Sequence, residues 1–271
     1  MDGGRRKFFL WLKIVIIIYS VVGIALYYLQ DYLLFHPVKI NPAYQYDFTV
    51  PHKEVNILYS STSKLSLVQF LPSTSHVKGV VLYFHGNKNN VSWYARFAPV
   101  FTKHDYEVWI LDYPGYGKST GVFTEEKSYD WALTLYKLAR ARFSPDSIVI
   151  YGKSMGTGIA AELASVRDCK ELILETPYYD MPSIIRHYLP VYPVNKMIRY
   201  KFPTWKYLRE VTAPVIIFHG TNDWIISCRN ARKLIPFLKQ TDEFIIIEGG
   251  GHNDLNKYPL FNNKLDSLLR K

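Results

Sequence analysis

The sequence predicts an α/β protein built on a mostly parallel, doubly wound sheet, and two features of its pattern indicate this class. Between residue 79 and the C-terminus, short apolar runs alternate with longer amphipathic stretches, as strands and helices do in βαβ units. Before them, residues 55–59 and 65–70 are two strand-like runs joined by a polar turn. They predict an antiparallel entry into the sheet.

Each predicted element follows from its own local pattern. Residues 79–84 are continuously apolar, so we expect a strand buried on both faces. Residues 125–143 form the clearest amphipathic helix, with Trp131 and Leu135 on one face. The other strands are predicted at 107–111, 147–151, 171–174, 215–218 and 244–247, and the other helices at 91–103, 157–164, 228–238 and 255–270.

The N-terminal residues predict a membrane anchor. Residues 8–29 are apolar apart from Lys13 and Ser20. At about 1.5 Å per residue they span roughly 33 Å, the thickness of a bilayer core. Because the stretch is longer than a signal-peptide core and lacks a small-x-small cleavage site, we expect an uncleaved signal anchor. A cleaved signal and a buried helix of a soluble protein are the alternatives.

Charge bears on the partner and on the orientation. The 271 residues carry a formal net charge of +10, with no Lys/Arg-rich run in the body of the chain, so a membrane surface is a simpler partner than nucleic acid. The basic residues before the apolar stretch predict a cytoplasmic N-terminus and a body outside the cytosol. We divide the chain into an anchor (1–30), a linker and first-strand region (31–54) and a large domain (55–271).

The stretch 152–156 has the form Gly-x-Ser-x-Gly and stands between a predicted strand and a predicted helix. This is the pattern of a nucleophile elbow, in which a strained turn exposes a serine hydroxyl. Glycines two positions either side of the serine keep side chains out of a turn too tight to hold them. The sequence therefore predicts Ser154 as a nucleophile.

A serine alcohol needs a base to take its proton, and the base needs an acid to orient it. In open α/β sheets such residues follow the carboxyl ends of strands. His252 follows the last predicted strand and Asp223 lies in the loop after 215–218, so we predict them as base and acid. Glu175, at the end of the strand after the elbow, is the rival acid.

Two other residues near these strand ends are predicted to be structural. His219 directly adjoins a strand end, where a side chain usually makes a structural hydrogen bond. Asp254 is predicted to cap a loop or a helix. The two cysteines, Cys169 and Cys228, are too few for a disulfide framework, and we expect both to be buried as small hydrophobic residues.

The oxyanion of an acyl-transfer reaction needs hydrogen-bond donors. The N–H of Met155 lies at a predicted helix start and is the first expected donor. The second is expected from the loop after 79–84, where His85-Gly86-Asn87 stands. We predict the N–H of Asn87, with its side chain as an alternative, while Gly86 lets the backbone approach the substrate and His85 is buried and structural.

The sequence predicts no cofactor and no metal. Its two Gly-Lys-Ser tripeptides, at 117–119 and 152–154, lack the glycine five residues earlier that a phosphate-binding loop requires. No spacing of His, Cys and acidic residues indicates a catalytic zinc site.

Five motifs in this order, at 83–87, 112–119, 152–156, 219–223 and 251–254, resemble the α/β-hydrolase superfamily. The membrane-anchored serine hydrolases of the bud-emergence type also have an anchor followed by a segment similar to residues 29–37. The resemblance implies an α/β-hydrolase fold, a Ser–Asp–His site and a cap over it. The chain departs from the pattern at Lys153, before the serine, which we expect to be solvent-exposed.

The expected cap is the insertion 176–209, which is rich in aromatic and basic residues. Such a surface could face anionic headgroups or line an acyl pocket, or its aromatics could simply pack the cap onto the body. We therefore expect a membrane-tethered serine hydrolase that cleaves a small ester or thioester, a lipid among the candidates, through an acyl-enzyme. A serine peptidase of the same fold and a catalytically silent anchored binding protein are the alternatives.

Overall fold

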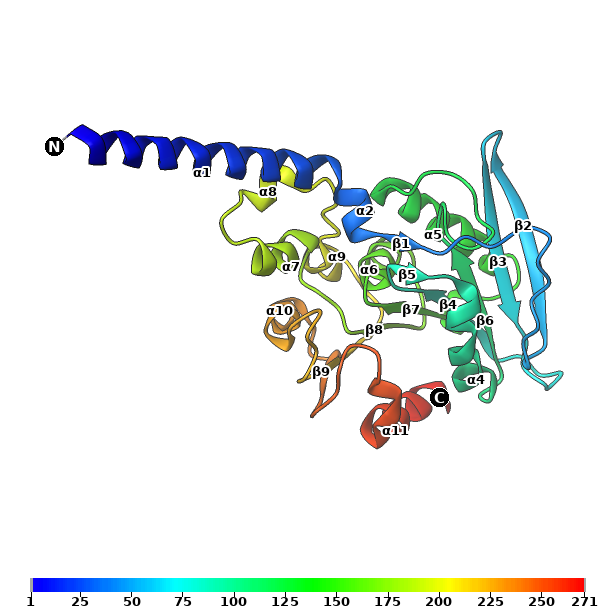
Figure 1. The fold of residues 1–271 in the computed structure, drawn as a ribbon. Coiled ribbons are helices and arrows are strands. Elements are labelled where there is room, and N and C mark those ends of the chain that lie inside the picture. The colour runs from blue at the N-terminus through cyan, green and yellow to red at the C-terminus, as the bar shows by residue number, and fades with distance from the viewer. Residues whose placement is uncertain (1, 271) are drawn as a thin grey trace.

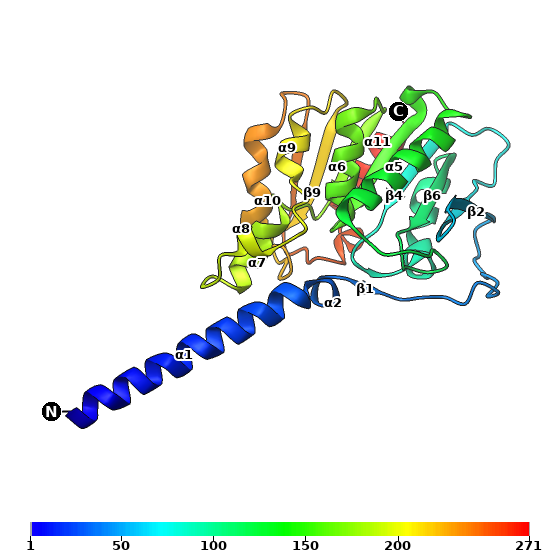
Figure 2. The ribbon, with the colours of Figure 1, turned by 90° about the horizontal axis from the view of Figure 1, so that it is seen from above.

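The computed structural model describes residues 2–270 and contains an eight-stranded sheet with helices on both faces (Figure 1, Figure 2). The strands of the sheet are β2 (His52–Ser60), β3 (Ser63–Phe70), β4 (Gly79–Phe84), β6 (Tyr106–Asp112), β7 (Ile148–Lys153), β8 (Glu171–Glu175), β9 (Val215–Gly220) and β10 (Glu243–Ile247). Their order is β10-β9-β8-β7-β4-β6-β3-β2. β3 is antiparallel to both its neighbours and every other pair is parallel, which confirms the predicted fold class.

Helices connect the parallel strands and cover the sheet. They are α3 (Val91–Tyr94), η1 (Ala95–Phe97), α4 (Ala98–Thr102), α5 (Glu125–Arg140), η2 (Pro145–Ser147), α6 (Gly156–Val166), α10 (Cys228–Ala231), η3 (Arg232–Phe237), η4 (Leu255–Lys257) and α11 (Pro259–Arg270). Three of the predicted helices are interrupted. Pro99 lies in the first turn of α4 and Pro259 starts α11, positions where the missing N–H of proline is tolerated, and Pro236 lies within the 3₁₀ helix η3.

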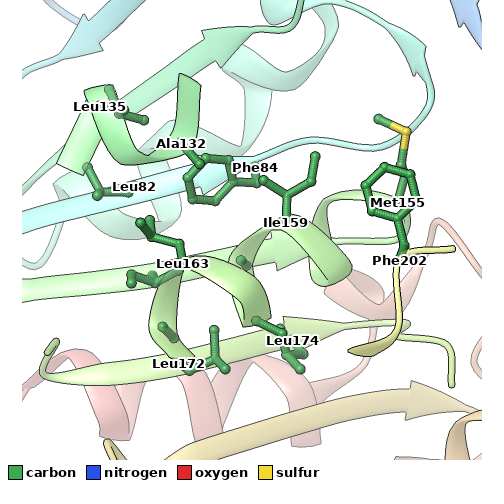
Figure 3. Close-up of a cluster of buried hydrophobic side chains, with 14 of the residues drawn as sticks. Leu82, Phe84, Ala132, Leu135, Met155, Ile159, Leu163, Leu172, Leu174 and Phe202 are labelled. Carbon is green, nitrogen blue, oxygen red and sulfur yellow. The ribbon is translucent and has the colours of Figure 1, made fainter. Parts of the chain in front are cut away.

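Strand β4 explains why the centre of the sheet is apolar throughout. Successive side chains of a strand point to opposite faces. Val80 and Leu82 pack with α5 and α6, whereas Val81 and Tyr83 pack with α4 and α11. Figure 3 shows the first of these two clusters, in which side chains from β4, β8, α5 and α6 meet. The central strand is thus buried by helices on both sides, as its unbroken apolar run predicts.

The N-terminal region lies outside the sheet. Helix α1 (Asp2–Tyr28) extends away from the body, and its apolar window is 0% buried among the described residues (Figure 1). A short helix, α2 (Gln30–Leu34), follows. The next segment, β1 (His36–Pro37), pairs in parallel with β5 (Lys88–Asn89), just after β4. The predicted linker is therefore held against the loop that follows a central strand.

The predicted cap forms three short helices after β8, namely α7 (Met181–Tyr188), α8 (Val194–Met197) and α9 (Thr204–Leu208). Helix α7 begins at Asp180, whose carboxylate accepts the Ser183 N–H over 2.7 Å. Tyr178, Tyr200 and Phe202 are buried, so these aromatic residues pack the cap onto the body. Helices α7 and α8 lie beside the C-terminal half of α1 in both views (Figure 1, Figure 2).

Candidate active site

The strand β7 and the helix α6 meet in a turn that holds Ser154 at φ +52°, a left-handed conformation that is strained for serine. A Cβ on Gly156 would lie 2.1 Å from the carbonyl oxygen of Phe84, and one on Gly152 would lie 2.6 Å from the carbonyl oxygen of Gly156. Neither position can hold a larger residue without moving the backbone. Packing therefore explains both glycines of the Gly-x-Ser-x-Gly motif.

His252 lies in the glycine-rich loop after β10, with its ring between Ser154 and Asp223. Its Nε2 is 2.9 Å from Ser154 Oγ, and its Nδ1 is 2.8 Å from Asp223 Oδ2. The loop is held by Asp254, whose carboxylate accepts the Gly251 N–H over 2.7 Å. The fold thus brings the three predicted triad residues into one hydrogen-bonded chain, and Asp254 caps the loop as expected.

Asp223 is oriented by the backbone that follows it. Its Oδ1 accepts the N–H groups of Ile225 and Ile226 over 2.9 and 2.8 Å, which leaves Oδ2 for His252. Burial raises the pKa of Asp223, but the hydrogen bond and charge of His252 and the Ile226 N–H outweigh it and hold the pKa below its usual range. The carboxylate is therefore ionised at neutral pH.

His219 lies beneath Asp223 and is fully buried. Its Nε2 is 2.9 Å from the carbonyl oxygen of Ile226 and 3.5 Å from Asp223 Oδ2. Burial lowers the pKa of His219, so the neutral ring donates to that carbonyl. This is the structural contact expected of His219, and it supports the loop that carries the acid.

Met155 directly follows the serine, and Asn87 follows Gly86, where an added Cβ would lie 3.6 Å from the Ser154 Cβ. Among the described residues, neither backbone N–H donates in the turn and loop hydrogen bonds. The side chain of Asn87, the alternative donor, is already engaged, because its amide donates to the carbonyl of Leu34 over 2.7 Å. A Cβ on Gly86 would lie 2.8 Å from the Tyr94 hydroxyl, so this position needs glycine.

His85 is fully buried, as expected of a structural residue. Its Nδ1 lies 2.8 Å from the carbonyl oxygen of Gly86, and its ring stacks on Tyr94 at a centroid distance of 4.9 Å. Its Nε2 lies 3.5 Å from Asp112. These contacts fix the backbone of the loop that carries Asn87.

The expectation that Lys153 is solvent-exposed is wrong. The side chain is 1% exposed, and its ammonium donates to the carboxylate of Glu175, which also accepts the Tyr151 hydroxyl. The ammonium also lies 3.4 Å from the carbonyl oxygen of His252. Glu175, the rival acid, is therefore paired with Lys153 rather than with His252. Lys153 and Glu175 are register partners on the neighbouring strands β7 and β8, so their side chains lie on the same face of the sheet.

Three supporting contacts escaped the sequence analysis. The hydroxyl of Tyr178 in the cap donates to the Met155 carbonyl over 3.0 Å, and Leu34 and His36 contact the Asn87 loop. The only signal for the last two was the segment 29–37 noted in the family resemblance.

Cys169 is buried as expected, whereas Cys228 is only partly buried; both are free thiols. No group of three His, Cys, Asp or Glu residues within 2–270 is arranged to hold a metal ion.

A family model described as serine aminopeptidase, S33, matches residues 75–207. That segment contains the serine and the oxyanion loop, and it ends before Asp223 and His252.

Among curated proteins, alpha/beta hydrolase domain-containing protein 17C of Xenopus tropicalis is 30% identical over 193 residues, which are 70% of this chain and 61% of the frog protein. The human 17C protein is 27% identical over 224 residues, 79% of this chain and 66% of its own. The chain thus spans about three fifths of the length of the frog relative.

Solved structures show the same fold at low sequence identity. An esterase from Pyrococcus furiosus superposes with a TM-score of 0.67 at 16% identity, covering 88% of this chain and 97% of its own. An alpha-beta hydrolase from Vibrio vulnificus has a TM-score of 0.66 at 19% identity and covers 80% of each chain. The sheet order, the elbow and these likenesses agree on one fold.

Proposed function

This chain belongs to the α/β-hydrolase superfamily, and on that premise we propose that it is a serine hydrolase that cleaves a carboxylic ester or thioester. One observation carries the proposal. Ser154 Oγ, the ring of His252 and the carboxylate of Asp223 are linked by contacts of 2.9 and 2.8 Å at the carboxyl ends of three parallel strands. The esterase from Pyrococcus furiosus and the alpha-beta hydrolase from Vibrio vulnificus share the fold that carries them.

The chemistry follows from the geometry. Ser154 Oγ attacks the acyl carbon while His252 Nε2 takes its proton, and Asp223 stabilises the imidazolium through Nδ1–H. The carbonyl oxygen, now negative, accepts the N–H groups of Met155 and Asn87. His252 then protonates the leaving alcohol or thiol, which departs and leaves an acyl-serine. Water, deprotonated by the same ring, releases the acid and restores the hydroxyl.

We also propose that α1 tethers the enzyme to a membrane. Residues Gly4–Tyr28 form a 25-residue helix whose apolar 18-residue window has a mean hydropathy of 2.4 and is 0% buried against the protein. A helix of that length can cross a bilayer, and an exposed apolar surface of this size is unfavourable in water. Arg5, Arg6 and Lys7 precede the apolar stretch that begins at Phe8, which favours a cytoplasmic N-terminus and a catalytic domain on the other side.

A fluorophosphonate probe tests the nucleophile. It should label the full-length protein, and Ser154→Ala should abolish labelling while leaving the circular dichroism spectrum unchanged. Ser165→Ala is a matched control, because Ser165 lies on α6, the helix that follows Ser154, and its hydroxyl donates to the carbonyl of Glu162. Unchanged labelling of the Ser154→Ala protein would overturn the assignment, and no labelling of the wild type would favour an anchored binding protein.

A serine peptidase is the second candidate, and the description of the matching family model favours it. The same triad would then protonate an amine leaving group. Paired assays of short p-nitrophenyl esters and aminoacyl amides on one enzyme preparation separate the two. Higher kcat/KM on the amides would replace the esterase proposal with the peptidase one.

A further inference from the structure

The cap makes direct contact with the apolar helix α1, well before the end of that helix. The Tyr19 hydroxyl donates to the carbonyl of Val191 over 3.0 Å, and the Tyr192 hydroxyl donates to the carbonyl of Tyr19 over 3.1 Å. The two tyrosine rings stack at a centroid distance of 4.5 Å. Gly23 allows this approach, because a Cβ there would lie 3.1 Å from the Tyr192 ring.

Further contacts continue along the helix towards its end. Gln30 accepts the Arg199 N–H over 2.8 Å, and Asp31 pairs with the Arg199 guanidinium over 2.9 Å. The cap segment from Val191 to Arg199 therefore runs in the same direction as the chain from Tyr19 to Asp31. Its two ends lie at different levels along the axis of α1, with Val191 nearer the middle of the helix and Arg199 beyond its end.

The position of Tyr19 sets the level of the cap. About 13 Å of helix, at ~1.5 Å per residue, separates Tyr19 from Tyr28 at the end of α1. If α1 crosses a bilayer, a group beside Tyr19 lies inside one leaflet rather than at its surface. We name residues 188–194 the cap tip; it reaches that level at Val191 and Tyr192, which contact Tyr19.

The composition of the cap tip suits a lipid environment. Its sequence, Tyr-Leu-Pro-Val-Tyr-Pro-Val, has no charged residue, and Val191 and Tyr188 are 71% and 56% exposed. Basic residues stand on both sides of it, with Arg186 before and Lys196 after. An apolar tip flanked by basic side chains matches the layers of a leaflet, in which hydrocarbon lies below anionic headgroups.

An apolar cavity of about 90 Å³ lies between the cap tip and α1. It is lined from the anchor side by Leu26 and Leu34 and from the cap side by Leu189 and Met197. Leu34 also accepts the side-chain hydrogen bond of Asn87, in the loop proposed to bind the oxyanion. Leu34 therefore connects this cavity to the proposed catalytic loop.

We propose that the cap tip inserts into the membrane leaflet that surrounds the C-terminal half of α1, so that the enzyme contacts the bilayer at two places. The proposal rests on the membrane anchoring proposed above. It commits to lipid as the occupant, because the tip is continuous with the apolar helix through the Tyr19–Tyr192 contact. The catalytic domain is then held at a fixed orientation to the membrane instead of swinging on a tether.

Site-specific fluorescence tests the insertion. The Cys228→Ser variant keeps one cysteine, Cys169, which is 8% exposed. Burial raises the pKa of the Cys169 thiol to about 12, so this thiol stays unreactive at pH 7. In this background Val191→Cys, and separately Pro193→Cys, is labelled with an environment-sensitive NBD dye. Leu58→Cys is the matched control, because Leu58 is 78% exposed on the edge strand β2, far from α1 (Figure 1).

The full-length proteins are reconstituted in vesicles of phosphatidylcholine and phosphatidylglycerol, with and without lipids spin-labelled on the acyl chain. We expect blue-shifted emission and loss of intensity to the spin label at positions 191 and 193, and neither effect at 58. Equal emission at all three positions, in protein that resists an alkaline carbonate wash, overturns the insertion alone. Release by the wash overturns the anchoring and the insertion together, whereas fluorophosphonate labelling of each variant reports on the hydrolase separately.

Discussion

The side-chain amide of Asn87 donates a hydrogen bond to the carbonyl oxygen of Leu34 over 2.7 Å. Leu34 ends the short helix after α1, and Asn87 lies in the loop after β4. The Asn87 carbonyl in turn accepts the His36 N–H over 3.0 Å and the Tyr116 hydroxyl over 2.9 Å. The segment that follows the proposed anchor therefore holds the loop whose N–H we propose as an oxyanion donor.

Replacing Asn87 with alanine should lower kcat about fivefold, since one hydrogen bond contributes ~1 kcal/mol. The variant keeps the backbone N–H and loses only the bond that positions it. KM should change little, because the oxyanion exists only after the substrate is bound. Steady-state kinetics on a p-nitrophenyl ester measures both constants. Lys88→Ala, at an exposed neighbouring position, should match the wild type. Equal kcat values for the two variants would contradict the positioning role of the hydrogen bond between Asn87 and Leu34.

Asp223→Asn should lower kcat by about 10³–10⁴ with the fold retained. The asparagine oxygen can still accept the N–H groups of Ile225 and Ile226, while its amino group faces His252 Nδ1 and favours the wrong tautomer. Burst and steady-state assays with the same ester give the loss. Asp254→Asn is the control, because an asparagine oxygen can still accept the Gly251 N–H, and its activity should stay near that of the wild type. Similar losses in both variants would argue against Asp223 as the acid.

Glu162 on α6 should make the fold less stable as pH rises. Burial, reinforced by Asp130, raises the pKa of Glu162 from 4.5 to about 7. Between these values the folded chain keeps a proton that the unfolded chain has released, so the free energy of unfolding falls as pH rises through this window. Because the side chain is only partly buried, the effect should be ~1–2 kcal/mol.

Urea unfolding in mild detergent at pH 5 and pH 8 measures this dependence. Glu162→Gln should lose less stability between the two pH values than the wild type does. Glu126→Gln, at an exposed position on α5, should behave as the wild type. An unchanged pH dependence in the Glu162→Gln protein would show that the group does not titrate in this range.

The buried pair of Lys153 and Glu175 should be essential for stability. Lys153→Met leaves the Glu175 carboxylate in the core without its ammonium partner, which should cost about 3–5 kcal/mol. The double variant Lys153→Met/Glu175→Gln removes the stranded charge and keeps an acceptor for the Tyr151 hydroxyl. It should recover most of the loss in urea unfolding. A double variant no more stable than the single one would mean that packing, not charge, sets the cost.

The positions of the strands along the chain and the identity of the elbow were predictable because both depend on neighbouring residues. The apolar run 79–84 is buried on both faces wherever it lies in a parallel sheet, and glycines at 152 and 156 allow only a tight turn around Ser154. The predicted helix 228–238 was less accurate, since α10 ends at Ala231 and a 3₁₀ helix that contains Pro236 follows it.

Local pattern was thus enough to predict the α/β class, the exposed apolar helix and the residues that the proposed triad uses. Long-range packing decided the rest. Lys153 and Glu175 are 22 residues apart, Asn87 and Leu34 are 53 apart, and Tyr192 and Tyr19 are 173 apart. No periodicity relates residues at such separations, because their contact depends on how strands cross over and how the cap folds back. Only the folded chain therefore shows that Lys153 is buried, that Leu34 holds the loop of Asn87 and that the cap contacts α1.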